Sequence, residues 1–281
     1  MYQLPPDLTE VRLHEEGGRV MHFASRYRFL QAINGLRPGC IHGLLAPTSM
    51  GKSTLARSII TDCSEHKKVG IVLSEETPLE YSSGFQRQEE PVNWDNIKFL
   101  NETEIVSMYQ TKEEQIDAII SFAIEQDIKI IFWDNITTGT ILGDSVRPNQ
   151  MATLLDRLKK NLFLNGIALF FIAHTNKGVK TEQGHEFQGE DVRGSAQYFM
   201  KSDYFYTLQT KTKDDVKFTF VKIAKHRFHD VKDMYYYYLS FKNGRYVKDE
   251  PKLRSWVQQL FEKEKRKDET TRTSHQLYSR R

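Results

Sequence analysis

The chain has 281 residues, of which 39% are hydrophobic and 12% aromatic, and its formal net charge at pH 7 is +3. This length suffices for one large domain with a buried core. The small net charge does not by itself identify a nucleic-acid binder, and no apolar stretch approaches the roughly 18 residues of a membrane-spanning helix. Cys40 and Cys63 lack metal-ligand spacing, which argues against a zinc module and a disulfide framework. We therefore expect a cytoplasmic protein that does not enter a membrane.

The composition of the chain shifts only near its two ends. Residues 1–27 have the character of an N-terminal arm, 28–250 that of a folded core and 251–281 that of a basic tail. The last 30 residues contain nine Lys or Arg and four Asp or Glu. This charge run predicts a solvated helix, and a contact with nucleic acid or a protein partner is the alternative.

The folded core begins with apolar residues at helical spacing and continues with alternating strand and helix patterns. Phe23, Tyr27, Leu30 and Ile33 predict a helix over 23–33. Four apolar runs then read as strands buried on both faces, and three amphipathic segments between them read as helices. The strands are expected at 40–46, 69–74, 128–134 and 166–174, and the helices at 53–66, 112–126 and 151–165. The alternation predicts an α/β fold with a mostly parallel sheet flanked by helices.

Beyond residue 200 the pattern changes to strand-like segments joined by short charged turns. The segments cover 203–210, 216–225 and 234–243. Such segments predict antiparallel strands added at one edge of the sheet.

The first apolar run leads into APTSMGKST, which matches a phosphate-binding loop except that alanine replaces the first glycine. Backbone N–H groups of such a loop surround phosphates, and the dipole of the following helix faces the same anion. Lys52 would reach the outer phosphates and the Ser53 hydroxyl would hold Mg²⁺. A chance match in a loop is the alternative, but a strand before and a helix after supply the context that the motif needs. The candidate nucleotide-binding residues are Ala46, Pro47, Thr48, Ser49, Met50, Gly51, Lys52, Ser53 and Thr54.

Acidic residues follow the second and third apolar runs. Glu75 and Glu76 could simply begin a helix, since carboxylates are favoured there and Pro78 suits a helix start. Alternatively, one of them polarises an attacking water beside a γ-phosphate as a general base. Asp134 ends the third run and is suited to hold Mg²⁺ through water.

His174 ends the fourth apolar run and precedes a polar, glycine-rich segment. A histidine at this place is either a structural residue or a sensor of the γ-phosphate. The polar segment is either a surface loop or a mobile basic loop that grips a nucleic-acid strand. Lys177 and Lys180 are its candidate contacts.

The ordered motifs resemble those of one ATPase family. They are NGLRPGCIHGLLAPTSMGKSTLA, KKVGIVLSEET, DNI, IAHTNKG, DVRGS and KHRF. Over about residues 28–248 the chain resembles the RecA-type ATPase domain of ring-shaped replicative DNA helicases, both the DnaB-like group and the phage primase-helicases. The resemblance implies a RecA-like P-loop ATPase core, ATP and Mg²⁺ as cofactors, and single-stranded DNA as a partner. The DnaB N-terminal domain and the phage zinc and primase modules are missing, so priming would need a separate primase.

The resemblance also implies roles for individual residues. Lys52 and Ser53 would bind ATP and Mg²⁺, Asp134 would be the second acid of the Mg²⁺ site, and His174 would be the phosphate sensor. Glu75 aligns as the catalytic carboxylate, although a shift of one residue would select Glu76 instead.

In the same family comparison, Lys177 and Lys180 match a DNA-contacting loop. Arg193 lies in the DVRGS segment that couples this loop to the nucleotide.

Lys225 and Arg227 form a K-x-R pair at the end of a predicted strand. The pair could merely decorate the end of a hairpin. By resemblance, it enters the ATP site of the neighbouring subunit, where a cation supplied in trans accelerates hydrolysis about 10³- to 10⁵-fold. Contacts of this head-to-tail kind close into rings or continue as filaments, and the resemblance favours a hexameric ring.

The leading interpretation is an ATP-dependent replicative DNA helicase, a translocase on single-stranded DNA of phage or plasmid type. A second interpretation is a RecA-like or KaiC-like ATP switch that assembles on DNA or on a protein partner without unwinding, because SEETP also resembles KaiC-type ATPases. A third is a helicase-shaped loader or regulator that works only inside a larger complex.

Overall fold

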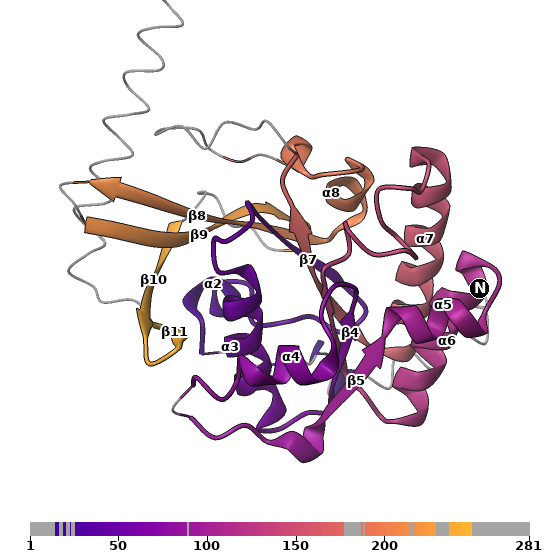
Figure 1. The fold of residues 1–281 in the computed structure, drawn as a ribbon, viewed down its shortest axis with the longest axis horizontal. Coiled ribbons are helices and arrows are strands. Elements are labelled where there is room, and N and C mark those ends of the chain that lie inside the picture. The colour runs from indigo at the N-terminus through magenta and orange to yellow at the C-terminus, as the bar shows by residue number, and fades with distance from the viewer. Residues whose placement is uncertain are drawn as a thin grey trace, which may run out of the picture.

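Nine strands form one sheet through the middle of the molecule (Figure 1). The computed structural model describes residues 15–16, 19–20, 23, 26–88, 90–176, 187, 189–213, 216–228 and 236–248. The strand order is β11-β10-β9-β8-β3-β7-β6-β4-β5. The strands are β3 (Ile41–Ala46), β4 (Val69–Leu73), β5 (Ile97–Asn101), β6 (Ile130–Asp134), β7 (Ala168–His174), β8 (Tyr204–Lys213), β9 (Val216–His226), β10 (Tyr236–Lys242) and β11 (Arg245–Lys248). A two-stranded pair, β1 (Glu15–Glu16) with β2 (Arg19–Val20), is separate from this sheet.

The sheet is parallel from β5 to β8 and antiparallel from β9 to β11. The predicted parallel core with antiparallel strands at one edge is therefore confirmed. The prediction for 203–210 was wrong in direction, because this segment is β8 and runs parallel to β3. The short helix α8 (Gln197–Lys201) precedes it and returns the chain to the edge where the parallel strands begin. The strand β5 was not predicted, since its alternating polar residues hide the apolar run.

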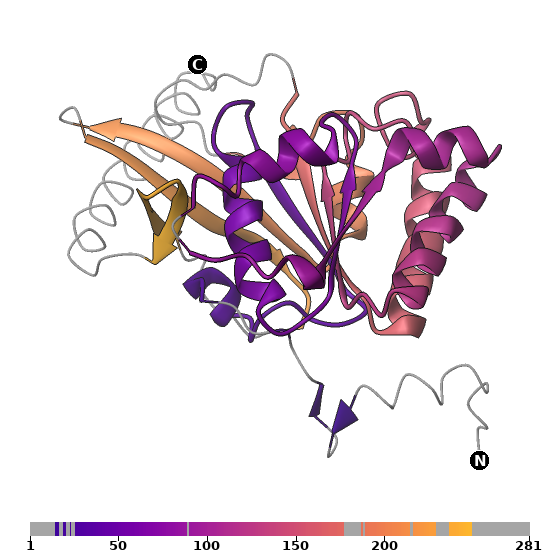
Figure 2. The same ribbon diagram turned by 60° about the horizontal axis from the view of Figure 1, so that its bottom comes forward.

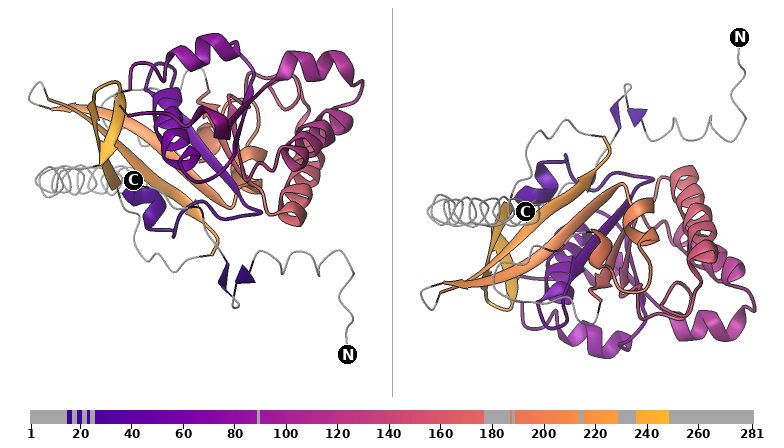
Figure 3. Two further views of the ribbon diagram at one scale, coloured as in Figure 1. Left: turned by 90° about the horizontal axis from the view of Figure 1, so that it is seen from below. Right: turned by 90° about the horizontal axis from the view of Figure 1, so that it is seen from above.

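Helices cover both faces of the sheet (Figure 2, Figure 3). One face carries α2 (Arg28–Gln31), α3 (Lys52–Ser64) and α4 (Pro78–Ser83). The other carries α5 (Glu102–Met108), α6 (Lys112–Glu125), α7 (Pro148–Asn165) and α8. Two short 3₁₀ turns, η2 (Trp94–Asn96) and η3 (Gly189–Asp191), complete the described elements. None of the helices in the described ranges combines the length and the apolar composition that crossing a bilayer requires.

The sheet separates two hydrophobic cores, and successive residues of each central strand enter opposite cores. In β7, Phe170 and Ile172 lie in the core that contains α3, whereas Phe171 and Ala173 lie in the core that contains α6 and α7. All four side chains are at most 1% exposed. Burial on both faces explains why the sequence of these strands is continuously apolar.

The helix predicted over 23–33 is much shorter in the structure. Phe23 pairs with Leu36 as an isolated bridge, with N···O distances of 2.8 and 3.0 Å, so the chain at Phe23 is extended. Only α2 is helical, yet Tyr27, Leu30 and Ile33 are all buried. The apolar spacing therefore indicated burial correctly but overstated the helix length.

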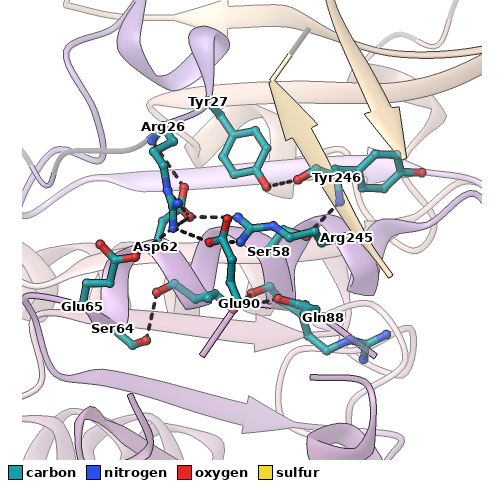
Figure 4. A network of polar contacts seen from close by, with 12 residues as sticks. Arg26, Tyr27, Ser58, Asp62, Ser64, Glu65, Gln88, Glu90, Arg245 and Tyr246 are labelled. Carbon is teal, nitrogen blue, oxygen red and sulfur yellow. Dashed lines mark hydrogen bonds and ion pairs between the residues drawn. The ribbon is translucent and has the colours of Figure 1, made fainter. Parts of the chain in front are cut away.

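Two arginines and three acids, which we call the arginine clasp, fasten the C-terminal strand β11 to helix α3 (Figure 4). Its centre is Asp62 of α3, whose side chain is 3% exposed and whose Oδ1 lies 3.1 Å from Arg245 Nη2 and 2.7 Å from Arg26 Nη2. Arg26 also binds Glu65 at 2.8 Å and Glu90 at 2.9 Å. Arg245 pairs with Glu90 as well. The clasp thereby joins four chain segments that are distant in sequence.

Tyrosines extend this connection to the phosphate-binding loop. The Tyr27 hydroxyl donates to the Tyr246 carbonyl at 2.7 Å, and the Tyr246 N–H donates to Ser58 Oγ of α3 at 3.2 Å. The Tyr246 hydroxyl lies 3.5 Å from the Met50 carbonyl. A Cβ at Gly51 would collide with that hydroxyl oxygen, so β11 packs directly on the loop.

Replacing Arg245 with Met should destabilise the protein, because Asp62 then keeps only the half-exposed Arg26 as its cation. Removing one partner of a buried ion pair costs about 3–5 kcal/mol, and the retained Arg26 places the expected loss near the lower end. The midpoint of urea denaturation measures it. Arg157→Met is the matched control, because Arg157 and Asp117 form an exposed pair, with side chains 46% and 39% exposed. Equal midpoints for the two variants would contradict a stabilising clasp.

Candidate functional site

The loop between β3 and α3 has the backbone shape of a phosphate-binding loop. Gly51 adopts the left-handed conformation (φ 82°) immediately before α3 begins at Lys52, and Ser49 is also left-handed (φ 64°). These turns place the loop at the N-terminus of a 13-residue helix, whose free N–H groups and dipole favour an anion. The loop follows the strand and precedes the helix as the motif requires.

Lys52 lies inside this loop. Its Nζ donates to the Pro47 carbonyl at 2.7 Å, and the residue is 5% exposed. Burial lowers the pKa of Lys52 to about 8, against the opposing effect of the Asp134 and Glu75 carboxylates. An ammonium group that is buried in this way has lost much of its hydration, and it can form strong hydrogen bonds with phosphate oxygens.

Asp134 ends β6 next to Ser53 of α3 and offers a position for a divalent cation. Its Oδ2 is buried and has no hydrogen-bond partner among the described residues. Burial raises the pKa of Asp134 to about 6, although the hydrogen bond with Ser53 and the charges of Arg57 and Lys52 act in the opposite direction. One carboxylate and one hydroxyl fit Mg²⁺, which takes its other ligands from phosphates and water. No group of three His, Cys, Asp or Glu side chains in the described ranges could hold a metal ion.

Glu75 and Glu76 lie beyond the end of β4 at the same edge of the sheet, and both are exposed. Glu75 Oε1 lies 3.9 Å from His174 Nε2, and the charge of Glu75 acts to raise the pKa of Lys52. The charge of Glu76 instead acts to raise the pKa of Asp134. Helix α4 begins only after its capping residue Thr77, so a helix start does not account for these two acids. Glu75 faces the loop lysine and the histidine, and its choice as the catalytic carboxylate stays a prediction.

His174 closes the site from the end of β7. Its Nδ1 lies 3.3 Å from Thr48 Oγ1 of the phosphate-binding loop, and its backbone N–H donates to Thr137 Oγ1 at 3.1 Å. Burial, followed by the charge of Lys52, lowers the pKa of His174 to about 4. A neutral imidazole therefore touches the loop on one side and Glu75 on the other.

The predicted DNA contacts are only partly described. Lys177 and Lys180 lie outside the described residues. Arg193 is paired with Asp144 at 2.6 Å, and its backbone N–H donates to the His174 carbonyl at 2.8 Å. Arg193 is thus tied to the histidine, and its proposed contact with DNA would have to compete with Asp144.

Lys225 and Arg227 lie on the side of the sheet where the parallel strands begin, whereas the phosphate-binding loop lies on the side where they end. The end of β9 pairs with the start of β8, which lies beside the beginning of β3, whereas the loop follows the end of β3. Lys225 Nζ donates to the carbonyls of Phe199 and Met200 at 2.7 and 2.9 Å, and Arg227 Nη2 donates to that of Met200 at 2.9 Å. Both cations therefore cap the C-terminal end of α8 in their own chain.

Two functional candidates, Arg57 and Glu102, carried no recognisable sequence signal. Arg57 lies over the Tyr81 ring at 4.9 Å from the ring centroid, and the charge of Arg57 acts to lower the pKa of Asp134. Glu102 is 2% exposed and accepts a hydrogen bond from the Ser74 hydroxyl next to Glu75. A polar residue in a helix pattern gives no hint of such burial, so only the assembled fold reveals these contacts.

The imidazole of His174 should stay neutral down to about pH 5, whereas the unfolded chain titrates near about pH 6.5. Since the unfolded state binds a proton in this window that the folded state does not, the contribution of His174 to stability decreases as the pH falls from about 6.5 to 4. The change His174→Gln should weaken this loss. NMR titration of the ring and urea midpoints across the same pH range test the expectation. A ring that titrates near its unfolded value would contradict it.

The comparisons with known proteins concern the fold. No protein-family model and no curated protein sequence matches the chain. A KaiC-like protein from the hyperthermophilic archaeon Pyrococcus horikoshii OT3 is structurally similar, with a TM-score of 0.62 and 16% sequence identity over 82% of this chain and 97% of the other. At this identity the similarity concerns the fold alone. Together with the mostly parallel sheet, the flanking helices and the antiparallel strands near the C-terminal end, it confirms the predicted RecA-like fold.

Proposed function

We propose that this chain binds ATP with Mg²⁺ and hydrolyses it at a site that a second copy of the chain completes. The observation that carries the proposal is that one set of groups suited to nucleotide chemistry lies at the edge of the sheet where the parallel strands β3, β6 and β4 end. The phosphate-binding loop, Lys52, Ser53, Asp134 and Glu75 all lie at this edge. The fold shared with a KaiC-like protein also supports a nucleotide-binding site.

Each group has a physical role in this proposal. Backbone N–H groups of the loop bind the phosphate oxygens, and Lys52 binds the outermost phosphates. Ser53 and Asp134 hold Mg²⁺, which when bound neutralises charge on the phosphates. Glu75 orients the attacking water and accepts its proton. His174 contacts the loop through Thr48 and would register whether the γ-phosphate is present.

Among the described residues of one chain, Arg57 and Arg193 are the arginines whose charges act on Asp134 and His174, respectively. Arg57 already lies over the Tyr81 ring, and Arg193 already pairs with Asp144. Lys225 and Arg227 cannot reach the loop of their own chain, because the length of β3, about 20 Å for six residues, lies between them. In this proposal, Lys225 and Arg227 therefore act on the γ-phosphate bound by another copy of the chain. Such an arrangement makes hydrolysis depend on assembly.

We infer further that the assembled protein moves on single-stranded DNA and unwinds duplexes, as a replicative helicase of phage or plasmid type does. The six ordered motifs support this reading. A hexameric ring would place Lys177, Lys180 and Arg193 around a central strand, and a separate primase would supply primers. Backbone contacts by these cations would be salt-sensitive and weakly dependent on sequence.

A switch without unwinding is the second candidate function. One similar solved structure is that of a KaiC-like protein, and this supports an ATPase that assembles on DNA or on a protein partner and releases it after hydrolysis.

The ATPase rate per subunit should rise with protein concentration and with single-stranded DNA. Arg227→Ala should lower kcat about 10³-fold or more, while ATP still binds, because the cation acts only on the transition state. Arg157→Ala, which removes an exposed guanidinium on α7, is the matched control and should keep the wild-type rate. A rate that is independent of concentration, and equal in the wild type and Arg227→Ala, would show that one chain completes the site alone.

A forked DNA duplex separates the two candidate functions. The helicase proposal predicts ATP-dependent strand separation by the purified protein, lost in Lys52→Ala. The switch proposal predicts nucleotide-dependent assembly on DNA or a protein without strand separation. A protein that hydrolyses ATP but neither binds single-stranded DNA nor is stimulated by it would refute the helicase proposal.

A further inference from the structure

Glu102 is a buried carboxylate outside every motif that the sequence presents. It is the first residue of α5 and is 2% exposed. Its Oε1 accepts a hydrogen bond from the Ile141 backbone N–H at 2.6 Å, and its Oε2 accepts one from the Ser74 hydroxyl. A Cβ at Gly139 would lie 2.5 Å from Oε2, so the loop after β6 fits closely around this carboxylate. The carboxylate therefore holds two segments at once.

The first of these segments leads to Glu75. Ser74 is the residue before Glu75, and its Oγ accepts a hydrogen bond from Trp133 Nε1 at 3.1 Å. The Ser74 backbone N–H also donates to the Asp134 carbonyl at 3.1 Å. A continuous chain of donors thus runs from the indole of Trp133 through Ser74 to Glu102. Each acid of the candidate site directly follows one member of this chain.

The second segment leads to His174. Ile141 and Asp144 belong to the loop after β6, and the Asp144 N–H donates to the Thr137 carbonyl at 3.2 Å. The Thr137 hydroxyl oxygen accepts from the backbone N–H of His174. Asp144 itself pairs with Arg193. By fixing the loop at Ile141, Glu102 helps to hold the histidine as well as the catalytic acid.

Stability alone does not explain a carboxylate at this place. Within the described ranges no Lys or Arg pairs with Glu102, and the Ser74 hydroxyl and the Ile141 N–H that donate to it are neutral. A charge buried without a cation is costly, and an apolar or amide side chain could fill the same volume at a lower cost. Both Glu102 oxygens lie against donors, the Ser74 hydroxyl and the Ile141 N–H, and a carboxylate offers an acceptor to each of them.

We propose that Glu102 is a positioning residue for ATP hydrolysis. It fixes the direction of Glu75 through Ser74, and it couples Glu75 to His174 through Ile141 and the loop after β6. This inference rests on the proposed ATPase function. A catalytic carboxylate on an exposed strand end needs such support, because a displacement of about 1 Å can lower the rate about 100-fold. Binding of the nucleotide does not involve this chain of hydrogen bonds, so its affinity should be unaffected.

The test compares Glu102→Gln, Ser74→Ala and the double variant with the wild-type protein in steady-state ATP hydrolysis. The change Glu102→Gln keeps the shape but turns one acceptor into a donor that opposes Ser74. We expect kcat to fall about 10- to 100-fold in each single variant, with the affinity for a fluorescent ATP analogue within about twofold of wild type. The double variant should be no slower than Glu102→Gln, because both changes break one chain. Glu104→Gln, which removes an exposed carboxylate from the same helix, should keep the wild-type kcat.

The outcomes separate this inference from the function on which it rests. If the wild type does not hydrolyse ATP, the proposed function and the inference both fail. If the wild type hydrolyses ATP and Glu102→Gln is equally fast, only the inference fails. Single effects that multiply in the double variant would also overturn it, because Glu102 and Ser74 would then act separately. If Glu102→Gln does not fold, Ser74→Ala decides alone, and a wild-type kcat in that variant overturns the proposal.

Discussion

The candidate site depends on charges that are held out of water where parallel strands end. Lys52 and Asp134 are both buried, and in each case burial is the largest influence on the pKa, which is lowered in the lysine and raised in the acid. Their mutual attraction does not compensate for the lost hydration. In the proposed function, phosphate would supply an opposite charge to Lys52, and Mg²⁺ would supply one to Asp134. The proposed nucleotide site thus depends on these two buried charges as well as on the loop.

Helix α3 transmits this constraint to the rest of the fold because it is held at both ends. Its first turn carries Lys52 and Ser53, and its last turns carry Asp62, where the arginine clasp attaches β11. Tyr246 of β11 also packs against the phosphate-binding loop. The C-terminal hairpin is thus part of the wall of the site, although a reading of the sequence assigns it only to the sheet edge. A shift of the loop would have to move the hairpin or break its contacts with α3.

The sequence was sufficient for the parts of the fold that depend on local pattern. Strands buried on both faces are continuously apolar, and the loop, Glu75, Asp134 and His174 lie at or just beyond the ends of four of them, so topology brings these residues together. The length of α2, the direction of β8 and the strand β5 were not predicted, because the pairing of Phe23 with Leu36, the return through α8 and the neighbour β4 are non-local. Glu102 and Arg245 escaped notice for the same reason. Their burial depends on partners that are 28 or more positions away.

The two cations of the K-x-R pair show how assembly could control such a site. In the single chain, Lys225 and Arg227 occupy the free carbonyls at the end of α8, and burial lowers the pKa of Lys225 to about 8. Entry into a neighbouring site would break these hydrogen bonds and leave the carbonyls to water. A weakly charged surface could not compensate for this loss, whereas the concentrated charge of a bound triphosphate could. In the proposed assembly, the pair would therefore leave its own helix only when the adjacent subunit holds a nucleotide, which links occupancy of one site to the conformation of the next chain.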